Sequence, residues 1–408
     1  MTPPGGSGRA RVGVVVQRYG PLVAGGSESL ARAVAARLAA DYDVTVFTSC
    51  ALDYVTWRNE LPSGRSADGP VEVLRFPVEE ERDLDAFNVL SESLYGRDSS
   101  REEELLWLRR QGPYLPGLVE SLRQRRAELD AILFFTYLYY PTVEGTRVAG
   151  ERSILVPTTH DEPPLRFGIY AELFSRPAAF AFLTRPEEEL VRSRFDLGAR
   201  PSAVAGIGID PPGPADVEAF RIRHDVAGPY ALYAGRIDAG KGCGEMLGHF
   251  DRYRRDVRGA AELLLIGRLA MPAPRQPGVR YLGFLDEAEK SAAMAGARAI
   301  LCPSPYESLS IVLLEGMARG VPALATARSA VLRDHCVRSG GGLPYANADE
   351  FVEALDLLVA DARIRGALGV AGRRYVEREY AWSAVMARYR QLIEAVRYRA
   401  LRASNPAT

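Results

Sequence analysis

Two glutamates in a segment rich in small residues form the pattern with the clearest capacity for chemistry. The segment reads Pro303-Ser-Pro-Tyr-Glu307-Ser-Leu-Ser-Ile-Val-Leu-Leu-Glu315 and follows a short apolar run at 299–302. The run predicts a buried strand, and Ser308 to Ser310 are candidate N-caps for the helix that follows. The unpaired N–H groups at such a helix start attract anions, a diphosphate included.

Glu307 and Glu315 are eight residues apart, which would place them about two helical turns apart along a similar face. Both carboxylates could then accept hydrogen bonds from the hydroxyl groups of one elongated ligand. Taken alone, two glutamates at this spacing are more typical of the solvated face of a surface helix. Their value as a site depends on the motifs that accompany them.

A glycine-rich loop, Ala234-Gly-Arg236-Ile-Asp-Ala-Gly-Lys241-Gly242, follows a predicted strand at 230–234. Glycines allow close backbone approach, and two cations five residues apart can clamp a diphosphate without a metal. Lysine is scarce in this chain, because only Lys241 and Lys290 are lysines among 51 basic residues. An ammonium is a compact charge that suits phosphate oxygens. A solvated surface loop is the alternative for this segment.

The first half of the chain contains three weaker candidates. His160 follows a predicted strand at 153–156 and would stand at its carboxyl end, although a lone histidine is more often structural. Gly25-Gly26 resembles a phosphate-binding turn before a predicted helix at 28–40. Asp83-Leu-Asp85 has the spacing of a carboxylate metal site, but it lies in a charged stretch rather than after a strand, which favours a solvated surface.

Composition excludes several classes of protein. The chain has 408 residues, 47% of them hydrophobic and 25% charged, which predicts a globular protein with more than one core. A formal net charge of −1 argues against nucleic-acid binding. The four cysteines lie far apart, which excludes a zinc cluster built from sequence neighbours and indicates a reducing compartment.

No apolar run resembles a signal peptide or is long enough for a membrane span, so we expect a cytoplasmic protein. Peripheral contact with a membrane remains open.

Strand-like and helical runs alternate in both halves, which predicts α/β domains with parallel sheets. The strand-like runs are 12–16, 43–48, 71–76, 131–135, 153–156 and 179–183 in the first half, and 230–234, 262–266, 279–282, 299–302 and 323–325 in the second. A charged stretch at about 79–126 interrupts the first alternation and predicts a helical insertion, with a lid as one role for it. A Gly- and Pro-rich break at 206–214 predicts the linker. Helices at 349–360 and from 382 to about 401 are expected to close the chain.

The chain resembles family-4 glycosyltransferases, which are retaining enzymes of GT-B fold. The resemblance runs from about residue 11 to 398 and is most specific in the second half. Three motifs occur there in the family's order, namely Gly235-Arg236…Lys241-Gly242, Leu282-Gly283-Phe284 and Glu307…Glu315.

This resemblance implies two Rossmann-like domains facing across a cleft. Residues 1–207 would form the acceptor-side domain, with the insertion, and 213–384 the domain that binds the nucleotide sugar. The C-terminal helix, 385–408, would cross back to pack on the first domain.

The resemblance also assigns roles to residues. Arg236 and Lys241 would hold the donor diphosphate, Glu315 the ribose and Glu307 the transferred sugar. The backbone near Phe284 would bind the base, Gly25-Gly26 would lie beside the phosphates, and His160 would lie near the reacting sugar. Ser308-Leu309-Ser310 stands where many members have Gly-Phe-Gly, which leaves the donor sugar open. Lys290 falls at a family lysine position whose role is open.

The implied reaction is transfer of a sugar, with retention, from a nucleoside-diphosphate sugar to an acceptor hydroxyl of a glycan, a lipid-linked sugar or a small natural product. The nucleotide sugar is a substrate, and no cofactor or metal is expected. A sugar-nucleotide epimerase, a phosphorylase of the same fold, and a catalytically silent nucleotide-sugar-binding subunit are the alternatives. The acceptor is not predicted.

Overall fold

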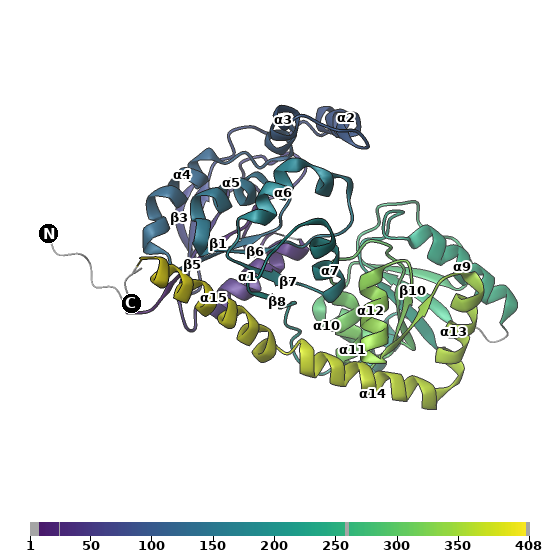
Figure 1. The fold of residues 1–408 in the computed structure, drawn as a ribbon. Coiled ribbons are helices and arrows are strands. Elements are labelled where there is room, and N and C mark those ends of the chain that lie inside the picture. The colour runs from purple at the N-terminus through teal and green to yellow at the C-terminus, as the bar shows by residue number, and fades with distance from the viewer. Residues whose placement is uncertain (1–7, 24, 258–260, 405–408) are drawn as a thin grey trace. The chain divides into compact units, whose positions relative to one another are not determined.

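A computed structural model describes residues 8–23, 25–257 and 261–404, and the chain divides into two units (Figure 1). The first unit comprises the chain up to Leu183, Glu187–Gly206 and everything from Met386 onwards. The second comprises Thr184–Pro186 and Ile207–Val385. Each unit contains one largely or wholly parallel β-sheet with helices between its strands, as the alternation in the sequence predicts.

The first unit has an eight-stranded sheet in the order β3-β4-β2-β1-β5-β6-β7-β8, in which only β3 and β4 pair antiparallel. Its strands are β1 (Arg11–Val15), β2 (Asp43–Ser49), β3 (Gly64–Asp68), β4 (Val71–Phe76), β5 (Ala131–Phe135), β6 (Ser153–Val156), β7 (Ala179–Phe182) and β8 (Ser202–Val204). Its helices are α1 (Gly26–Leu38), α2 (Leu84–Leu94), α3 (Arg101–Gln111), α4 (Pro116–Arg125), α5 (Tyr140–Ala149), α6 (Gly168–Ser175) and α7 (Arg185–Arg194), with short 3-10 turns at Arg126–Glu128, Gly150–Arg152 and Pro163–Arg166.

The second unit has a six-stranded parallel sheet in the order β11-β10-β9-β12-β13-β14. Its strands are β9 (Tyr230–Ala234), β10 (Glu262–Ile266), β11 (Val279–Gly283), β12 (Ala299–Cys302), β13 (Ala323–Thr326) and β14 (Gly342–Tyr345). Its helices are α8 (Val217–Arg223), α9 (Cys243–Asp256), α10 (Glu287–Ala295), α11 (Ile311–Ala318), α12 (Ala330–Ser339), α13 (Ala348–Ala360) and α14 (Ala362–Glu379).

The last helix, α15 (Trp382–Ser404), returns the chain to the first unit. From Met386 onwards it belongs to that unit, where Nε of Arg390 lies 2.6 Å from a carboxylate oxygen of Asp41. The hydroxyl of Tyr42 donates to Glu394 at 3.1 Å. These polar contacts fasten the C-terminal helix to the first unit, close to the start of β2.

Three strands are absent from the sequence-based expectation, and so is the helix α14. β3 is polar and exposed at the sheet edge, β8 has only three residues, and β14 contains Gly342 and Pro344, so none has the apolar run of a buried strand. α14 contains three glycines, which lower helix propensity. Its packing explains one of them, because a Cβ at Gly369 would lie 2.1 Å from the carbonyl oxygen of Gly320.

The stretch predicted as an insertion, about 79–126, contains α2, α3 and α4. Trp107 and Leu108 of α3 are buried in the core of the first unit, and the indole N–H of Trp107 donates to Ser91 at 2.9 Å. Asp83 is the N-cap of α2 and accepts from the backbone N–H of Ala86 at 3.0 Å. One aspartate of the Asp-x-Asp pair therefore has a structural role.

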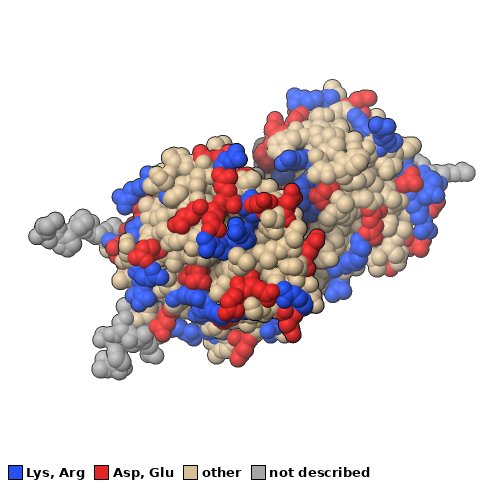
Figure 2. All heavy atoms as spheres, turned by 90° about the horizontal axis from the view of Figure 1, so that it is seen from above, with Lys and Arg blue, Asp and Glu red and all other residues tan. Residues whose placement is uncertain are grey.

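One face of the protein has mixed charge. Figure 2 shows acidic and basic side chains interspersed over the face in view. All four cysteines are free thiols in buried positions. Among the helices that the structure describes, none combines the length and the apolar character needed to cross a membrane.

Glu104 joins the inserted helices to the rest of the first unit. Its buried carboxylate accepts from the backbone N–H groups of Gly168 at 3.0 Å and Ile169 at 2.9 Å, at the start of α6. It also accepts from the hydroxyl of Ser99 at 2.8 Å. The N–H groups at the start of a helix have no acceptor within that helix. The carboxylate of Glu104, which comes from a distant helix, is the acceptor for two of them here.

We therefore expect Glu104→Ala to lower the free energy of unfolding by roughly 2–3 kcal/mol, the scale of hydrogen bonds to a buried charged group. Urea denaturation followed by circular dichroism measures this change. Glu102→Ala, which removes an exposed carboxylate from the same helix, is the matched control and should change stability by less than about 0.5 kcal/mol. Equal effects for the two variants would contradict the capping role of Glu104.

His335 anchors the loop before α11 from inside the second unit. Its side chain is fully buried, with Nε2 2.9 Å from the carbonyl oxygen of Leu309 and Nδ1 3.1 Å from the hydroxyl of Tyr375. A neutral imidazole that donates from Nε2 and accepts at Nδ1 satisfies both contacts. Burial lowers the pKa of His335 from 6.5 to about 4, because the charged ring would be poorly solvated there.

Since this pKa is lower in the folded state than in the unfolded chain, His335 should stabilise the fold above pH 6.5 and lose that contribution as the pH falls towards 4. We expect the stability difference between the wild type and His335→Gln to narrow by roughly 2 kcal/mol between pH 7.5 and pH 5. Urea unfolding at a series of pH values measures both proteins. A difference that stays constant over this range would contradict the neutral, buried state of the ring.

Candidate functional site

The loops at the carboxyl ends of the second sheet contain most of the predicted site residues. Because all neighbouring strands of that sheet are parallel, these ends share one edge. The loop after β9 contains Arg236 and Lys241 and leads to α9, and the loop after β12 contains Glu307 and leads to α11. β9 and β12 are direct neighbours in the sheet, so the two loops leave it side by side.

Gly242 makes the contact between these two loops sterically possible. It has a left-handed backbone with a φ of 73°, immediately before α9. A Cβ at this position would lie 2.3 Å from the carbonyl oxygen of Pro303, far inside van der Waals contact. Any other residue would push the lysine-bearing loop away from the loop that contains Glu307.

Lys241 and Glu307 form an ion pair across this contact. Nζ of Lys241 lies 2.8 Å from Oε1 of Glu307, and the two side chains are 36% and 18% exposed. An ammonium has three donors, so this pair leaves the lysine able to bind a further acceptor. The arrangement can therefore hold an anion next to a carboxylate that accepts hydrogen bonds from hydroxyl groups.

Asp238 organises the cationic loop, although the sequence pattern does not single it out. Its Oδ1 accepts from the backbone N–H of Lys241 at 2.8 Å, and its Oδ2 pairs with the guanidinium of Arg236. Burial alone would raise the pKa of the Asp238 carboxyl, but the hydrogen bonds from Arg236 and from backbone N–H groups outweigh burial and lower it. The only sequence signal for Asp238 is its place between the two cations.

Glu315 is held by the chain's other lysine. Nζ of Lys290 lies 3.0 Å from both carboxylate oxygens of Glu315. Only Oε1 is oriented to accept a hydrogen bond, whereas Oε2 is buried and has no hydrogen-bond partner among the described residues. The protein therefore leaves the acceptor capacity of one carboxylate oxygen of Glu315 unused.

The two glutamates do not share a helix, so that prediction was wrong. α11 begins at Ile311, which places Glu315 on the helix and Glu307 in the loop before it. Ser310 precedes the helix with a left-handed φ of 66°, and the structure records no capping hydrogen bond from its side chain to a described residue. The predicted serine cap is also wrong, because a capping side chain reaches the first N–H groups from an extended backbone.

The start of α11 therefore keeps its first N–H groups for water or a ligand. Ser308, Leu309 and Ser310 shape this turn, and the contact with His335 holds the buried Leu309 in place. Phe284 follows β11 at the same edge of the sheet, and its ring is 86% exposed. An aromatic ring exposed to this extent is available for contact with a flat or apolar part of a ligand.

In the first unit, His160 follows β6 and shares a carboxylate with a buried tyrosine. Its Nε2 lies 3.4 Å from one oxygen of Glu162, whose other oxygen accepts from the hydroxyl of Tyr137 at 2.7 Å. His160 itself is 41% exposed. Glu162 can therefore orient the imidazole while a ring edge stays accessible, and the sequence pattern does not single Glu162 out.

Gly25 is the N-cap residue of α1, and Gly26 is the first residue of that helix. Next to them, Arg18 and Glu28 form a buried ion pair in which Nη2 lies 2.5 Å from Oε1. Ser27 donates to the other oxygen of Glu28 at 2.9 Å. The carboxylate of Glu28 thus lies within the first turn of α1, and its negative charge weakens the attraction of this helix start for a phosphate.

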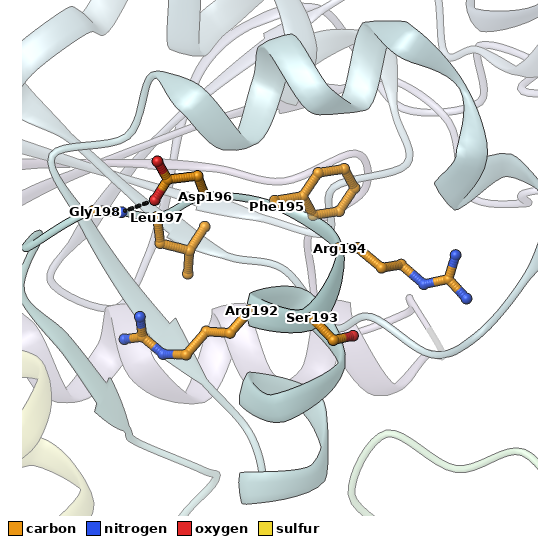
Figure 3. A pocket seen from close by; sticks show the side chains of 7 residues that line it. All are labelled: Arg192, Ser193, Arg194, Phe195, Asp196, Leu197 and Gly198. Atoms are coloured by element: carbon orange, nitrogen blue, oxygen red, sulfur yellow. Dashed lines mark hydrogen bonds between the residues drawn. The ribbon is translucent and has the colours of Figure 1, made fainter.

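Two surface pockets lie elsewhere. One, of about 390 Å³, is formed by residues 192–198 of the first unit, where Asp196 accepts from the backbone N–H of Gly198 (Figure 3). Its arginines are already paired, Arg192 with Glu188 and Arg194 with Asp161. The other, of about 510 Å³, is lined by Leu247 and residues 271–276. Neither contains a predicted site residue.

The described residues contain no group of three or more His, Cys, Asp or Glu side chains placed to hold a metal ion together.

Residues 228–361 match the family described as "Glycosyl transferases group 1". The chain is similar to the glycogen synthase of Thermus thermophilus, at 31% identity over 191 residues, which covers 45% of this chain and 43% of that protein. It is also similar to the phosphatidyl-myo-inositol mannosyltransferase of Mycobacterium leprae, at 36% identity over 122 residues, or 29% of this chain and 32% of the relative. The matches therefore span less than half the length of these relatives.

Solved structures match almost the whole chain in fold. Sucrose-phosphate synthase from Thermosynechococcus elongatus has a TM-score of 0.68 at 18% identity, covering 97% of this chain and all of that one. Anabaena HepE in complex with UDP also has a TM-score of 0.68, at 13% identity, covering 95% of this chain and all of its own. The chain therefore has the two-domain GT-B fold of glycosyltransferases, and its residues 228–361 match the group 1 glycosyl transferase family.

Proposed function

We propose that this protein transfers a sugar, with retention, from a nucleoside-diphosphate sugar to an acceptor hydroxyl without a metal ion. The observation that carries the proposal is the pairing at one sheet edge of the second unit, where each lysine of the chain binds one glutamate of the Glu-x7-Glu motif. This edge offers cations, an uncapped helix start and carboxylate oxygens within two adjacent loops and their helices. Diphosphate, ribose and sugar hydroxyls require these groups.

Arg236 and Lys241 bind the diphosphate in this proposal. The ammonium of Lys241 keeps donors beyond the one directed at Glu307, and the first N–H groups of α11 add positive potential nearby. As the bond between the sugar and the diphosphate breaks, negative charge grows on the leaving phosphate. Fixed cations that already face this position stabilise that charge without rearranging.

Glu307 binds the transferred sugar and Glu315 the ribose. Both are carboxylates in contact with a lysine, so each is held in one orientation before the donor arrives. The leaving phosphate would help to deprotonate the acceptor hydroxyl on the same face of the sugar, which accounts for retention. His160, oriented by Glu162, is the group of the first unit that we assign to the reacting sugar.

Activity should survive EDTA, because Arg236 and Lys241 supply the positive charge that a metal ion provides in metal-dependent transferases. The donor is identified by incubating the protein with UDP-, GDP- and ADP-linked glucose and mannose. The rate of hydrolysis is measured as the amount of nucleoside diphosphate released over time. The rate with EDTA should stay within about twofold of the rate without it. Complete loss that Mg²⁺ or Mn²⁺ restores would refute metal independence.

The two glutamates should show different defects when each is changed to glutamine. Glu315→Gln removes an acceptor for the ribose hydroxyls, so it should weaken binding of the bare nucleoside diphosphate and of the full donor alike. The expected loss is roughly 1.5–3 kcal/mol, about one to two decades in affinity. Glu307→Gln should leave the bare nucleotide almost unaffected and reduce turnover of the donor, because its contact strengthens as positive charge develops on the sugar.

Calorimetry with the nucleoside diphosphate and with the intact donor measures both variants, and each variant is the control for the other. Equal losses for both ligands in both variants would show that the two carboxylates do not divide the donor. A wild-type protein that binds none of the nucleoside diphosphates would overturn the proposed function itself.

A further inference from the structure

Lys290 contacts Glu315, and the proposed function gives it no contact with the donor. It lies on α10, 25 residues before Glu315 in the sequence, yet its ammonium contacts that carboxylate at 3.0 Å. The two side chains are each about one-fifth exposed. Among the described residues, the only other anion beside the ammonium is Glu287, at 3.5 Å, whose side chain is 89% exposed and therefore screened by solvent.

Two further contacts constrain α10 around this pair, one within the helix and one to the end of α11. Asp286 caps α10 by accepting from the backbone N–H of Glu289 at 2.8 Å. On the other side, the guanidinium of Arg319, just after α11, donates to the hydroxyl of Ser291 at 2.8 Å. The ammonium of Lys290 therefore meets Glu315 from a helix whose position is determined independently of the pair.

The geometry at Glu315 is asymmetric. Nζ of Lys290 lies 3.0 Å from both oxygens, but its hydrogen bond goes to Oε1, while Oε2 is buried and accepts none from the described residues. Leaving a buried carboxylate oxygen without a donor is costly, so such an atom indicates a group that arrives later and donates. The hydroxyl groups of a ribose are donors of this kind.

The chemistry of lysine explains why this position is not arginine in a chain where 51 basic residues include only two lysines. A guanidinium is a planar fork that binds both oxygens of a carboxylate at once. An ammonium is a point charge, and here it lies 3.0 Å from both oxygens but directs its hydrogen bond at Oε1 alone. Arginine at this position would occupy the atom that the ligand needs.

We propose that Lys290 is a positioning residue that holds the Glu315 carboxylate with its hydrogen bond on Oε1, so that Oε2 keeps its capacity to accept hydrogen bonds from the ribose hydroxyls of the nucleotide. This proposal rests on the proposed function, which assigns Glu315 to the ribose. Lys290 does not touch the nucleotide itself. It determines the orientation of the carboxylate, and thereby the preference of the site for a ligand with a ribose diol.

The test compares nucleotides with and without that diol. Calorimetry is performed with UDP, GDP and ADP on the wild type, and the nucleotide that binds best is then compared with its 2′,3′-dideoxy analogue. The variants are Lys290→Met, Lys290→Arg and, as a control, Glu287→Gln, which removes only the exposed neighbour of the ammonium. Thermal unfolding of each variant verifies that it is folded.

We expect Lys290→Met to bind the ribose nucleotide roughly tenfold more weakly and to bind the dideoxy analogue within about twofold of the wild type. Lys290→Arg should lose a similar factor despite keeping the charge, because its guanidinium covers both oxygens of Glu315. Glu287→Gln should bind both ligands like the wild type.

Equal losses for the ribose and dideoxy nucleotides in Lys290→Met would overturn the proposal, since a merely structural role would affect both. Unchanged binding in Lys290→Met, or full affinity in Lys290→Arg, would also overturn it while leaving the proposed function intact. A wild type that binds no nucleoside diphosphate would overturn both.

Discussion

The ion pair between Lys241 and Glu307 links the two loops on which the proposed donor site depends. Its 2.8 Å contact joins the loop after β9 to the loop after β12, so a cation and a carboxylate are held together at the edge of the sheet. Neither loop could approach the other if Gly242 carried a side chain, because its Cβ would meet the carbonyl of Pro303. Because Gly242 has no side chain, the two loops can approach closely enough for Lys241 and Glu307 to form an ion pair. This ion pair orients both side chains.

A second ion pair between a lysine and a glutamate joins α10 to α11. Lys290 and Glu315 pair at 3.0 Å, and the residues around them are constrained by contacts of their own, such as the hydrogen bond between Arg319 and Ser291. The start of α11 lies between Glu307 and Glu315 in the sequence. The turn before it is held by the buried, neutral His335, which contacts the carbonyl oxygen of Leu309. Charged groups near the surface are therefore oriented by uncharged or fully paired groups beneath them. This is the usual requirement for a preorganised polar site, because a loosely held charge would be solvated by water instead.

The first unit supports its own polar groups in a comparable way. Glu162 receives a hydrogen bond from the buried Tyr137 and lies beside the partly exposed His160. Glu104 reaches from α3 to the start of α6, and this contact makes the inserted helices part of the packed structure. In both places a carboxylate joins an element of the sheet domain to a loop or helix that is distant in sequence. The buried pair of Arg18 and Glu28 has the same character beside α1.

Sequence alone determined the architecture where burial leaves a strong pattern. Strands such as β5 and β9 are apolar throughout, since helices cover a parallel sheet on both faces, and their limits were predicted from this property. β3 was missed because an exposed edge strand needs no apolar run, and α14 because packing against Gly320 overrides the low helix propensity of its glycines. Residue types and their order also identified Lys241, Glu307 and Glu315 as candidates.

Only the tertiary structure decided how those candidates are paired. The sequence reasoning placed both glutamates on one helix, whereas a left-handed Ser310 separates Glu307 from α11. It offered no role for Lys290, because a contact between residues 25 apart depends on how α10 and α11 pack and leaves no local periodicity. The same holds for Asp238 and Glu162, whose importance comes from their neighbours in space. Local sequence patterns indicate which residues are buried and which form turns. The partner of each charged side chain, in contrast, depends on how segments distant in the sequence pack against each other.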